Sequence, residues 1–148
     1  MKKLLLAIGF LTLGAVSVNA QDISENAIGV RFGDNSGFGA EISYQRKLSD
    51  TNRLEIDLGI RKGNAFKAIG LYQWVWQLEN QFNWFAGAGG GIATASSNSA
   101  LFIAGAIGIE YNFDIPLVIS LDYRPELGFS DYYDGLNSDF GLGIRYQF

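Results

Sequence analysis

Apolar side chains recur at every second position along most of this chain, in segments separated by short polar turns. Segment 54–61 is the clearest case, because its even positions are all Leu or Ile and its odd positions are Glu, Asp, Gly and Arg. Side chains of a β-strand point alternately to opposite faces of the sheet. The pattern therefore predicts strands with one apolar face and one polar or small face.

Eight such segments follow one another, and we place them at 28–33, 38–47, 54–61, 66–78, 82–92, 101–111, 117–124 and 140–148. The chain loosens over 94–99, and a long outer link is expected over 125–139. A tilted strand of about nine to eleven residues crosses a bilayer, and an even number of strands returns both termini to the same side. The predicted fold class is all-β, an eight-stranded antiparallel up-and-down transmembrane β-barrel.

A soluble barrel of the lipocalin kind has the same period with its apolar face turned inward. Here the face opposite the apolar one is built of Gly, Ala and Ser with five acids and five bases, which suits a narrow lumen better than a wet exterior. We expect these charges to form a compensated network that closes the lumen. Its residues are Arg31, Glu41, Lys47, Glu55, Asp57, Lys67, Glu110, Asp122, Arg124 and Arg145.

Aromatic residues gather near both ends of the predicted strands, as expected for side chains anchored at two membrane interfaces. The girdle at the periplasmic end is Tyr44, Trp76, Phe82, Trp84, Tyr111, Phe113, Tyr146 and Phe148. The outer girdle is Phe32, Phe38, Phe66, Tyr123 and Phe140. A preference of aromatic residues for strands explains their number but not this placement.

The first twenty residues have the three parts of a secretory signal peptide: Lys2 and Lys3, an apolar run over 4–16, and a small residue at position 20. We expect cleavage after Ala20, which leaves 21–148 as one barrel domain; a retained anchor is the alternative. With Lys2 and Lys3 removed, nine basic residues oppose fifteen acidic ones, a net charge of −6. That balance argues against nucleic-acid binding.

Little in the sequence points to catalysis. The chain has no His and no Cys, which removes imidazole and thiolate chemistry, disulfides and a lipid anchor on cysteine. Glu55 and Asp57 are better explained as lumen charges than as an acid and base pair, and the glycine run at 87–91 as strand bending. The acids at 126, 131, 134 and 139 do not have the spacing of a calcium loop. We expect no enzyme, cofactor or metal.

The last segment, 140–148, alternates apolar residues and ends on an aromatic one. In this the chain resembles the OmpA/OmpX-type small outer-membrane barrels over the whole mature sequence. The resemblance implies a Gram-negative outer membrane, lipid contact, a monomer, and recognition of Leu142, Ile144, Tyr146 and Phe148 by the barrel-assembly machinery. Two functions stay open: a closed structural or surface-interaction protein, or a narrow porin-like channel for small solutes or ions.

Overall fold

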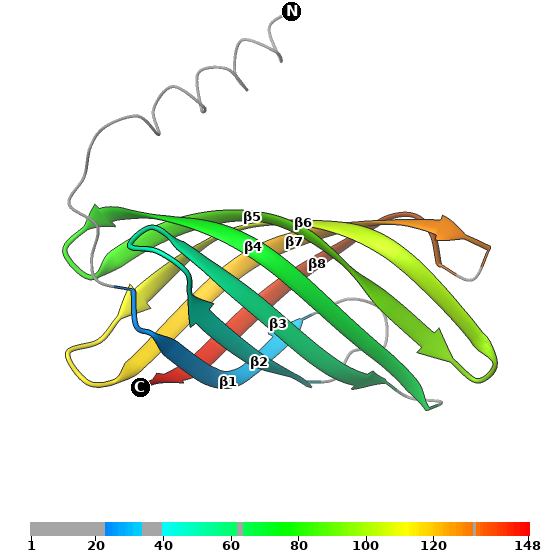
Figure 1. The fold of residues 1–148 in the computed structure, drawn as a ribbon, viewed down its shortest axis with the longest axis horizontal. Helices are drawn as coiled ribbons and strands as arrows, with labels where there is room; N and C mark the ends of the chain where they lie inside the picture. Colours follow the sequence, from blue (N-terminus) through cyan, green and yellow to red (C-terminus); the bar gives the residue numbers. More distant parts are fainter. Residues whose placement is uncertain (1–22, 34–39, 62–63, 132) are drawn as a thin grey trace, which may run out of the picture.

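The computed structural model describes residues 23–33, 40–61, 64–131 and 133–148, and these form a closed antiparallel barrel (Figure 1). Its strands in chain order are β1 (Asn26–Gly33), β2 (Ala40–Lys47), β3 (Asn52–Arg61), β4 (Ala65–Glu79), β5 (Phe82–Ala95), β6 (Asn98–Asn112), β7 (Leu117–Ser130) and β8 (Tyr133–Gln147). Each strand pairs with its neighbours in sequence, and β8 closes on β1. The predicted fold class is confirmed. The expected signal peptide and Phe38 lie outside the described residues.

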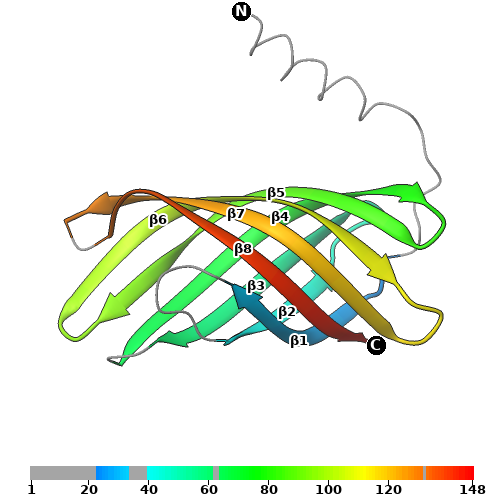
Figure 2. The same ribbon diagram turned by 180° about the vertical axis from the view of Figure 1, so that it is seen from behind.

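The register around the barrel shows how strongly the strands are staggered. A path of paired residues from Gly135 in β8 runs through Gly128, Phe102, Gly91, Ile69, Asp57, Ser43 and Gly29 and returns to β8 at Arg145, ten residues along the chain. Stagger of this size requires the strands to tilt against the barrel axis, as Figures 1 and 2 show. Eight strands then enclose only enough space for side chains.

The predicted long outer link over 125–139 is wrong. β7 continues to Ser130 and β8 begins at Tyr133, so most of that range is paired strand. Pro125, the first residue of that range, cannot donate to a ladder. The structure accommodates it where the β6–β7 pairing lapses, between the pairs Ala104–Glu126 and Ile107–Tyr123. Likewise, most of the loosened 94–99 range belongs to β5 and β6.

These longer strands also correct the predicted outer girdle. Tyr123 and Phe140 lie near the middle of β7 and β8, where their rings pack together with centroids 4.9 Å apart, and not at the outer strand ends. The hydroxyl of Tyr123 lies 2.9 Å from the Ser138 hydroxyl, so this polar group is satisfied on the outer wall.

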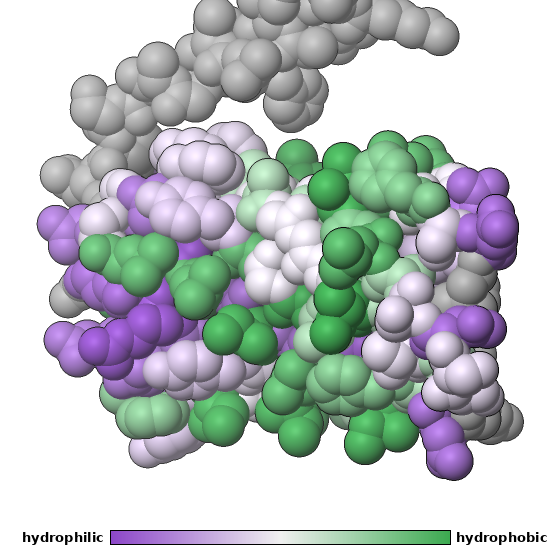
Figure 3. All heavy atoms as spheres, turned by 45° about the vertical axis from the view of Figure 1, so that its right-hand side comes forward, coloured by the Kyte–Doolittle hydropathy of each residue, from purple (hydrophilic) through white to green (hydrophobic). Residues whose placement is uncertain are grey.

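The outer wall of the barrel is apolar and its interior is charged. Ile42 and Ile60 keep 59% and 75% of their surface exposed, whereas Arg31 and Arg124 are fully buried. Figure 3 shows hydrophobic residues over the middle of one face and hydrophilic residues toward both ends. A water-soluble barrel has the opposite arrangement, and lipid is the solvent that suits this one. No helix within the described residues is long and apolar enough to span a membrane.

Leu58→Arg tests which face meets lipid. Leu58 lies in the middle of β3 on the outer wall and is 42% exposed. We expect the substitution to lower the free energy of unfolding by about 2–4 kcal/mol, because an arginine near the bilayer midplane loses most of its hydration. Urea titration of protein refolded into lipid vesicles measures the change.

Leu48→Arg is the matched control. Leu48 follows β2 at the end of the barrel that carries both termini and is 52% exposed. An arginine at this depth reaches water, so its cost is about 0–1 kcal/mol. Equal losses from the two substitutions would contradict the assignment of the outer wall to lipid.

Candidate functional site

The lumen is the candidate site, because nearly all of the charged strand residues point into it. Nine of the ten residues expected there are buried: Arg31, Glu41, Glu55, Asp57, Lys67, Glu110, Asp122, Arg124 and Arg145. Lys47 is the exception. It is the last residue of β2, its side chain is 21% exposed, and its Nζ lies 3.3 Å from Asp50 in the following turn. Lys47 therefore lies at the rim of the lumen.

Arg31 on β1 is held by three carboxylates from three other strands. Its Nη2 donates to Asp122 at 2.5 Å, and its Nη1 donates to Asp139 at 2.7 Å and to Glu41 at 3.2 Å. The guanidinium lies flat against Gly141 of β8, where a Cβ would come within 2.3 Å of the Arg31 Cζ. Arg31 thus joins β1 to β2, β7 and β8 across the lumen.

Arg124 on β7 forms the second centre of the network. Its Nη1 donates to Asp57 at 2.8 Å, its Nη2 to Glu41 at 2.7 Å, and its Nε to Glu126 at 3.2 Å. The Arg124 Nη2 also lies 3.2 Å from Asp139. Arg31 and Arg124 therefore share two carboxylates, those of Glu41 and Asp139.

Arg145 on β8 lies inside the barrel, as the alternation predicts. It donates from Nε to the Ser43 hydroxyl and from Nη1 to the Ser120 hydroxyl, each at 2.9 Å. Its Nη2 reaches Glu55 at 3.2 Å, and the side chain of Gln45 donates to the same carboxylate at 2.5 Å. The five residues of this group belong to β2, β3, β7 and β8.

Arg53 and Glu110 form a further buried pair nearer the end that carries the termini. Arg53 donates to Gln73 at 2.7 Å and to Glu110 at 3.1 Å, and its guanidinium lies 5.0 Å from the Phe85 ring centroid. Arg53 Nη2 and Glu110 Oε2 are 2.8 Å apart, but their angle does not make a hydrogen bond, so we treat that contact as an ion pair. Asn83 completes the group with a 3.2 Å bond to Glu110.

Lys67 and Glu126 occupy the outer end of the lumen. The Lys67 ammonium donates to both Glu126 oxygens, at 2.6 and 2.5 Å, and the Tyr133 hydroxyl donates to the same carboxylate. Lys67 also lies 5.2 Å from the ring centroid of Phe102 and 5.8 Å from that of Tyr133. Two aromatic rings thus cover an ion pair that is itself shielded from water.

Three members of the network, Arg53, Glu126 and Asp139, were missed from the sequence. Arg53 directly precedes the segment assigned from Leu54, and the other two were assigned to an outer link. The signal that identifies them is the period of two itself. Continued one residue back from Leu54, past Pro125 to Glu126, and one residue back from Phe140 to Asp139, it places all three on the lumen face.

One side of the lumen is apolar, which corrects the expectation of a polar core throughout. The buried cluster there is Ile69, Leu71, Ala93, Phe102, Ala104 and Ala106, all from β4, β5 and β6. Gly91 of β5 makes room for it, because a Cβ at that position would lie 2.6 Å from the Phe102 ring. The indistinct faces of segment 66–78 in the sequence reflect this apolar lining.

The predicted periplasmic girdle lies at the end of the barrel that carries both termini. Trp76 and Trp84 stack with centroids 4.3 Å apart, and Tyr111 packs edge-on against Phe82 and Phe113. Tyr146 and Phe148 stack at 6.2 Å, and Tyr44 donates to Asn26 at 2.7 Å. The proposed assembly residues Leu142, Ile144, Tyr146 and Phe148 all face outward.

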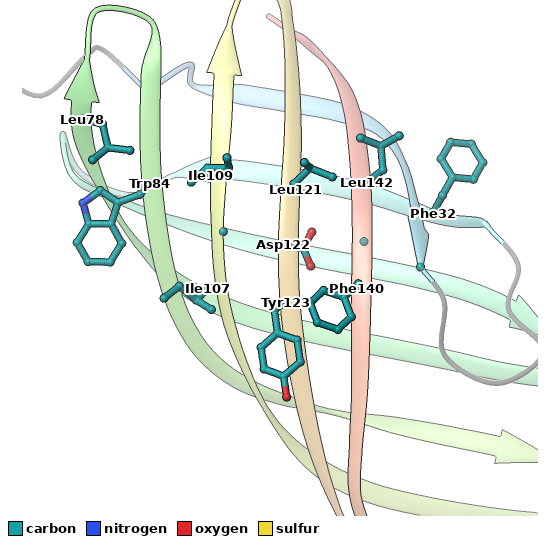
Figure 4. Close-up of a pocket in the computed structure, with 13 residues that line it drawn as sticks. Phe32, Leu78, Trp84, Ile107, Ile109, Leu121, Asp122, Tyr123, Phe140 and Leu142 are labelled. Atoms are coloured by element: carbon teal, nitrogen blue, oxygen red, sulfur yellow. The ribbon is translucent and has the colours of Figure 1, made fainter. Parts of the chain in front are cut away.

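A hollow of about 920 Å³ lies against the outer wall. Figure 4 shows its apolar lining, which includes Trp84, Ile107, Leu121 and Phe140, on the strand wall. Asp122 is the one titratable carboxylate in the lining, and Arg31 binds it from within. The lining of this hollow is therefore mainly apolar.

The lumen charges hold one another and leave little chemistry for a substrate. Each carboxylate of the network contacts a guanidinium or an ammonium group, and all are at most 9% exposed. Among the described residues no group of three His, Cys, Asp or Glu side chains is arranged to hold a metal ion. The arrangement cross-links the strands of the wall.

No family model matches the chain, and no curated protein matches its sequence. Among solved structures, the N-terminal β-barrel domain of OprF from Pseudomonas aeruginosa is similar with a TM-score of 0.73 and 13% identity, over 86% of this chain and all (100%) of that domain. Neisserial surface protein A, NspA, is similar with a TM-score of 0.62 and 13% identity, over 83% of this chain and 94% of that chain. Ail, the attachment invasion locus protein of Yersinia pestis, is similar with a TM-score of 0.54 and 16% identity, over 84% of this chain and 97% of that chain. The chain thus has the fold of the OmpA/OmpX-type small outer-membrane barrels.

Removing Arg53 tests whether a buried pair depends on both partners. Arg53→Met leaves the Glu110 carboxylate buried without its cation, and we expect it to lower the free energy of unfolding by about 3–5 kcal/mol. The double variant Arg53→Met, Glu110→Met removes both charges, and we expect its free energy of unfolding to fall clearly less than that of Arg53→Met. A double-mutant cycle in urea gives the coupling energy, and additive losses would contradict the pairing.

Gly141→Ala tests the close contact with Arg31. The new methyl group meets a guanidinium that three carboxylates already fix, so we expect a loss of about 1–3 kcal/mol from overpacking. Gly70→Ala is the matched control, because a Cβ there has no atom within 4 Å. Similar unfolding midpoints for the two variants would show that Arg31 moves aside freely.

Proposed function

We propose that this protein is a non-enzymatic integral outer-membrane barrel with a closed, ion-paired lumen, and that its role is structural or one of surface interaction. The observation that carries the proposal is the burial of a charged network inside a barrel whose outer wall is apolar. Arg31, Arg124 and Glu126 are 0% exposed and therefore have no contact with solvent. A lumen filled in this way has no aqueous path at the level of these residues.

The short connections support a structural role over an elaborate receptor. The outer links after β5 and β7 span only residues 96–97 and 131–132. Ail is named an attachment invasion locus protein and NspA a surface protein, and these names support a surface-interaction role for this chain. The β5–β6 and β7–β8 hairpins offer only short links for such a role.

The proposal includes export through a signal peptide cleaved after Ala20, insertion by the barrel-assembly machinery through the C-terminal strand, and a monomer in a Gram-negative outer membrane. The removable leader pattern and the outward-facing residues of 142–148 support these steps. N-terminal sequencing of the outer-membrane fraction tests the first step, with Gln21 as the expected first residue.

Conductance separates the closed barrel from the narrow channel. We expect refolded wild-type protein to give no discrete conductance steps in a planar lipid bilayer. Arg124→Ala removes the cation between Glu41 and Asp57 and is expected to open a cation-conducting path. Arg46→Ala removes an exposed arginine of the outer wall, and we expect this variant to give no discrete conductance steps. Regular steps from the wild-type protein would support the channel instead.

A further inference from the structure

Arg46 is unusual among the cationic residues of this barrel. Of the Lys and Arg residues whose side chains the structure describes, it alone lies on the outward face of a strand. Its neighbours on that face of β2 are Tyr44 and Ile42, and Leu54 lies beside it on β3. An arginine near the end of a wall that is otherwise apolar is placed to interact with lipid headgroups.

Arg46 is fixed in place by Asn26. Its Nη1 donates to Asn26 Oδ1 at 2.8 Å, and the Tyr44 hydroxyl donates to the same oxygen at 2.7 Å. Asn26 in turn exchanges two backbone hydrogen bonds with Phe148, at 3.1 and 2.9 Å. The guanidinium thus lies at the level of the aromatic girdle, where lipid headgroups meet water in a membrane barrel.

The remaining donors of Arg46 have no carboxylate partner within the described part of the chain. A guanidinium has five N–H donors, and one of its nitrogens is committed to Asn26. Arginine binds a phosphate through two parallel hydrogen bonds, with a geometry that a flexible ammonium group does not match. A fixed arginine with unused donors at the headgroup level is suited to a phosphate.

An apolar surface continues from this position toward the middle of the wall. Ile28 and Ile56 pair with Tyr44 from the two neighbouring strands, and Ile42 follows Tyr44 two residues along β2. All three isoleucines face outward and are between 39% and 59% exposed. A phosphate at Arg46 therefore has an acyl-sized apolar surface directly beside it.

We propose that Arg46, positioned by Asn26, binds the phosphate of a phospholipid in the leaflet next to the chain termini, with an acyl chain along Ile28, Ile42 and Ile56. The site rests on the proposed function, because it requires the apolar wall to lie in a bilayer. It gives the barrel a defined lipid contact beyond general solvation by lipid, at a point that ties β1 and β2 to the C-terminal Phe148.

Native mass spectrometry of protein refolded in an uncharged maltoside detergent tests the site. The probe is phosphatidylglycerol, and the measured quantity is the apparent affinity of the most tightly retained lipid. We expect Arg46→Gln to weaken it about tenfold, since charged hydrogen bonds to the phosphate are lost. Arg46→Lys keeps the charge but loses the paired hydrogen-bond geometry. We expect its lipid affinity to lie between those of the wild-type protein and Arg46→Gln, and we expect the same of Asn26→Ala.

Lys47→Gln is the matched control. It removes one positive charge from the adjacent residue, which faces the rim and pairs with Asp50. We expect lipid retention to stay at the wild-type level. Equal weakening by Arg46→Gln and Lys47→Gln would overturn the site in favour of general electrostatic attraction. Equal retention of a diacyl glycolipid without phosphate, or stronger binding of inorganic phosphate alone, would also overturn it.

Vesicle insertion keeps the two proposals apart. Wild-type protein and Arg46→Gln should both fold into phosphatidylcholine vesicles, as shown by heat-modifiable migration on gels. Folding of both with unchanged lipid affinity would reject the lipid site and leave the membrane barrel standing. Failure of the wild-type protein to insert would reject both.

Discussion

Two arginines that share two carboxylates hold the barrel together at the point where it closes. Arg31 and Arg124 both contact Glu41 and Asp139, and the four residues belong to β1, β7, β2 and β8. The β1–β8 junction joins the two ends of the chain, so it has the largest separation in sequence of any strand pair. Charge-assisted bonds across the lumen secure this junction from within, in a space with few competing water molecules.

The division of the lumen into a charged side and an apolar side follows from its width. An eight-stranded barrel has room for side chains only, so each large residue requires a small one nearby. Phe102 lies over Gly91, and Arg31 lies over Gly141. The glycines of β5 therefore accommodate the apolar side, and the glycine of β8 accommodates the charged side. Both sides exclude water, and the closed lumen of the proposed function depends on their fitting together.

The sequence predicted the fold well because one face of nearly every strand is apolar and the other is small or charged. It also predicted that Arg145 faces inward beside an acid, and the structure places Arg145 3.2 Å from Glu55. The partners of Arg124 could not be predicted from the sequence, because the stagger of the strands decides which residues lie at the same level of the barrel. Glu126 and Asp139 were missed for a different reason, since the predicted segments ended at Arg124 and began at Phe140, although the alternation continues beyond both limits.

Polar partners in the lumen also determine which face of β4 turns inward. Lipid and a closed apolar lumen are both dry, so an apolar side chain gains little from one over the other. β4 shows the consequence, because Ile69 and Leu71 lie inside while Tyr72 and Trp74 lie outside. Hydrophobicity alone does not orient such a strand. Lys67 and Gln73 share the inner face with Ile69 and Leu71, and both find partners there, in Glu126 and Arg53. A shift of β4 by one residue would turn Lys67 toward lipid and would leave the buried Glu126 carboxylate without its ammonium partner. The ion pairs therefore specify the register of strands whose hydrophobic pattern does not.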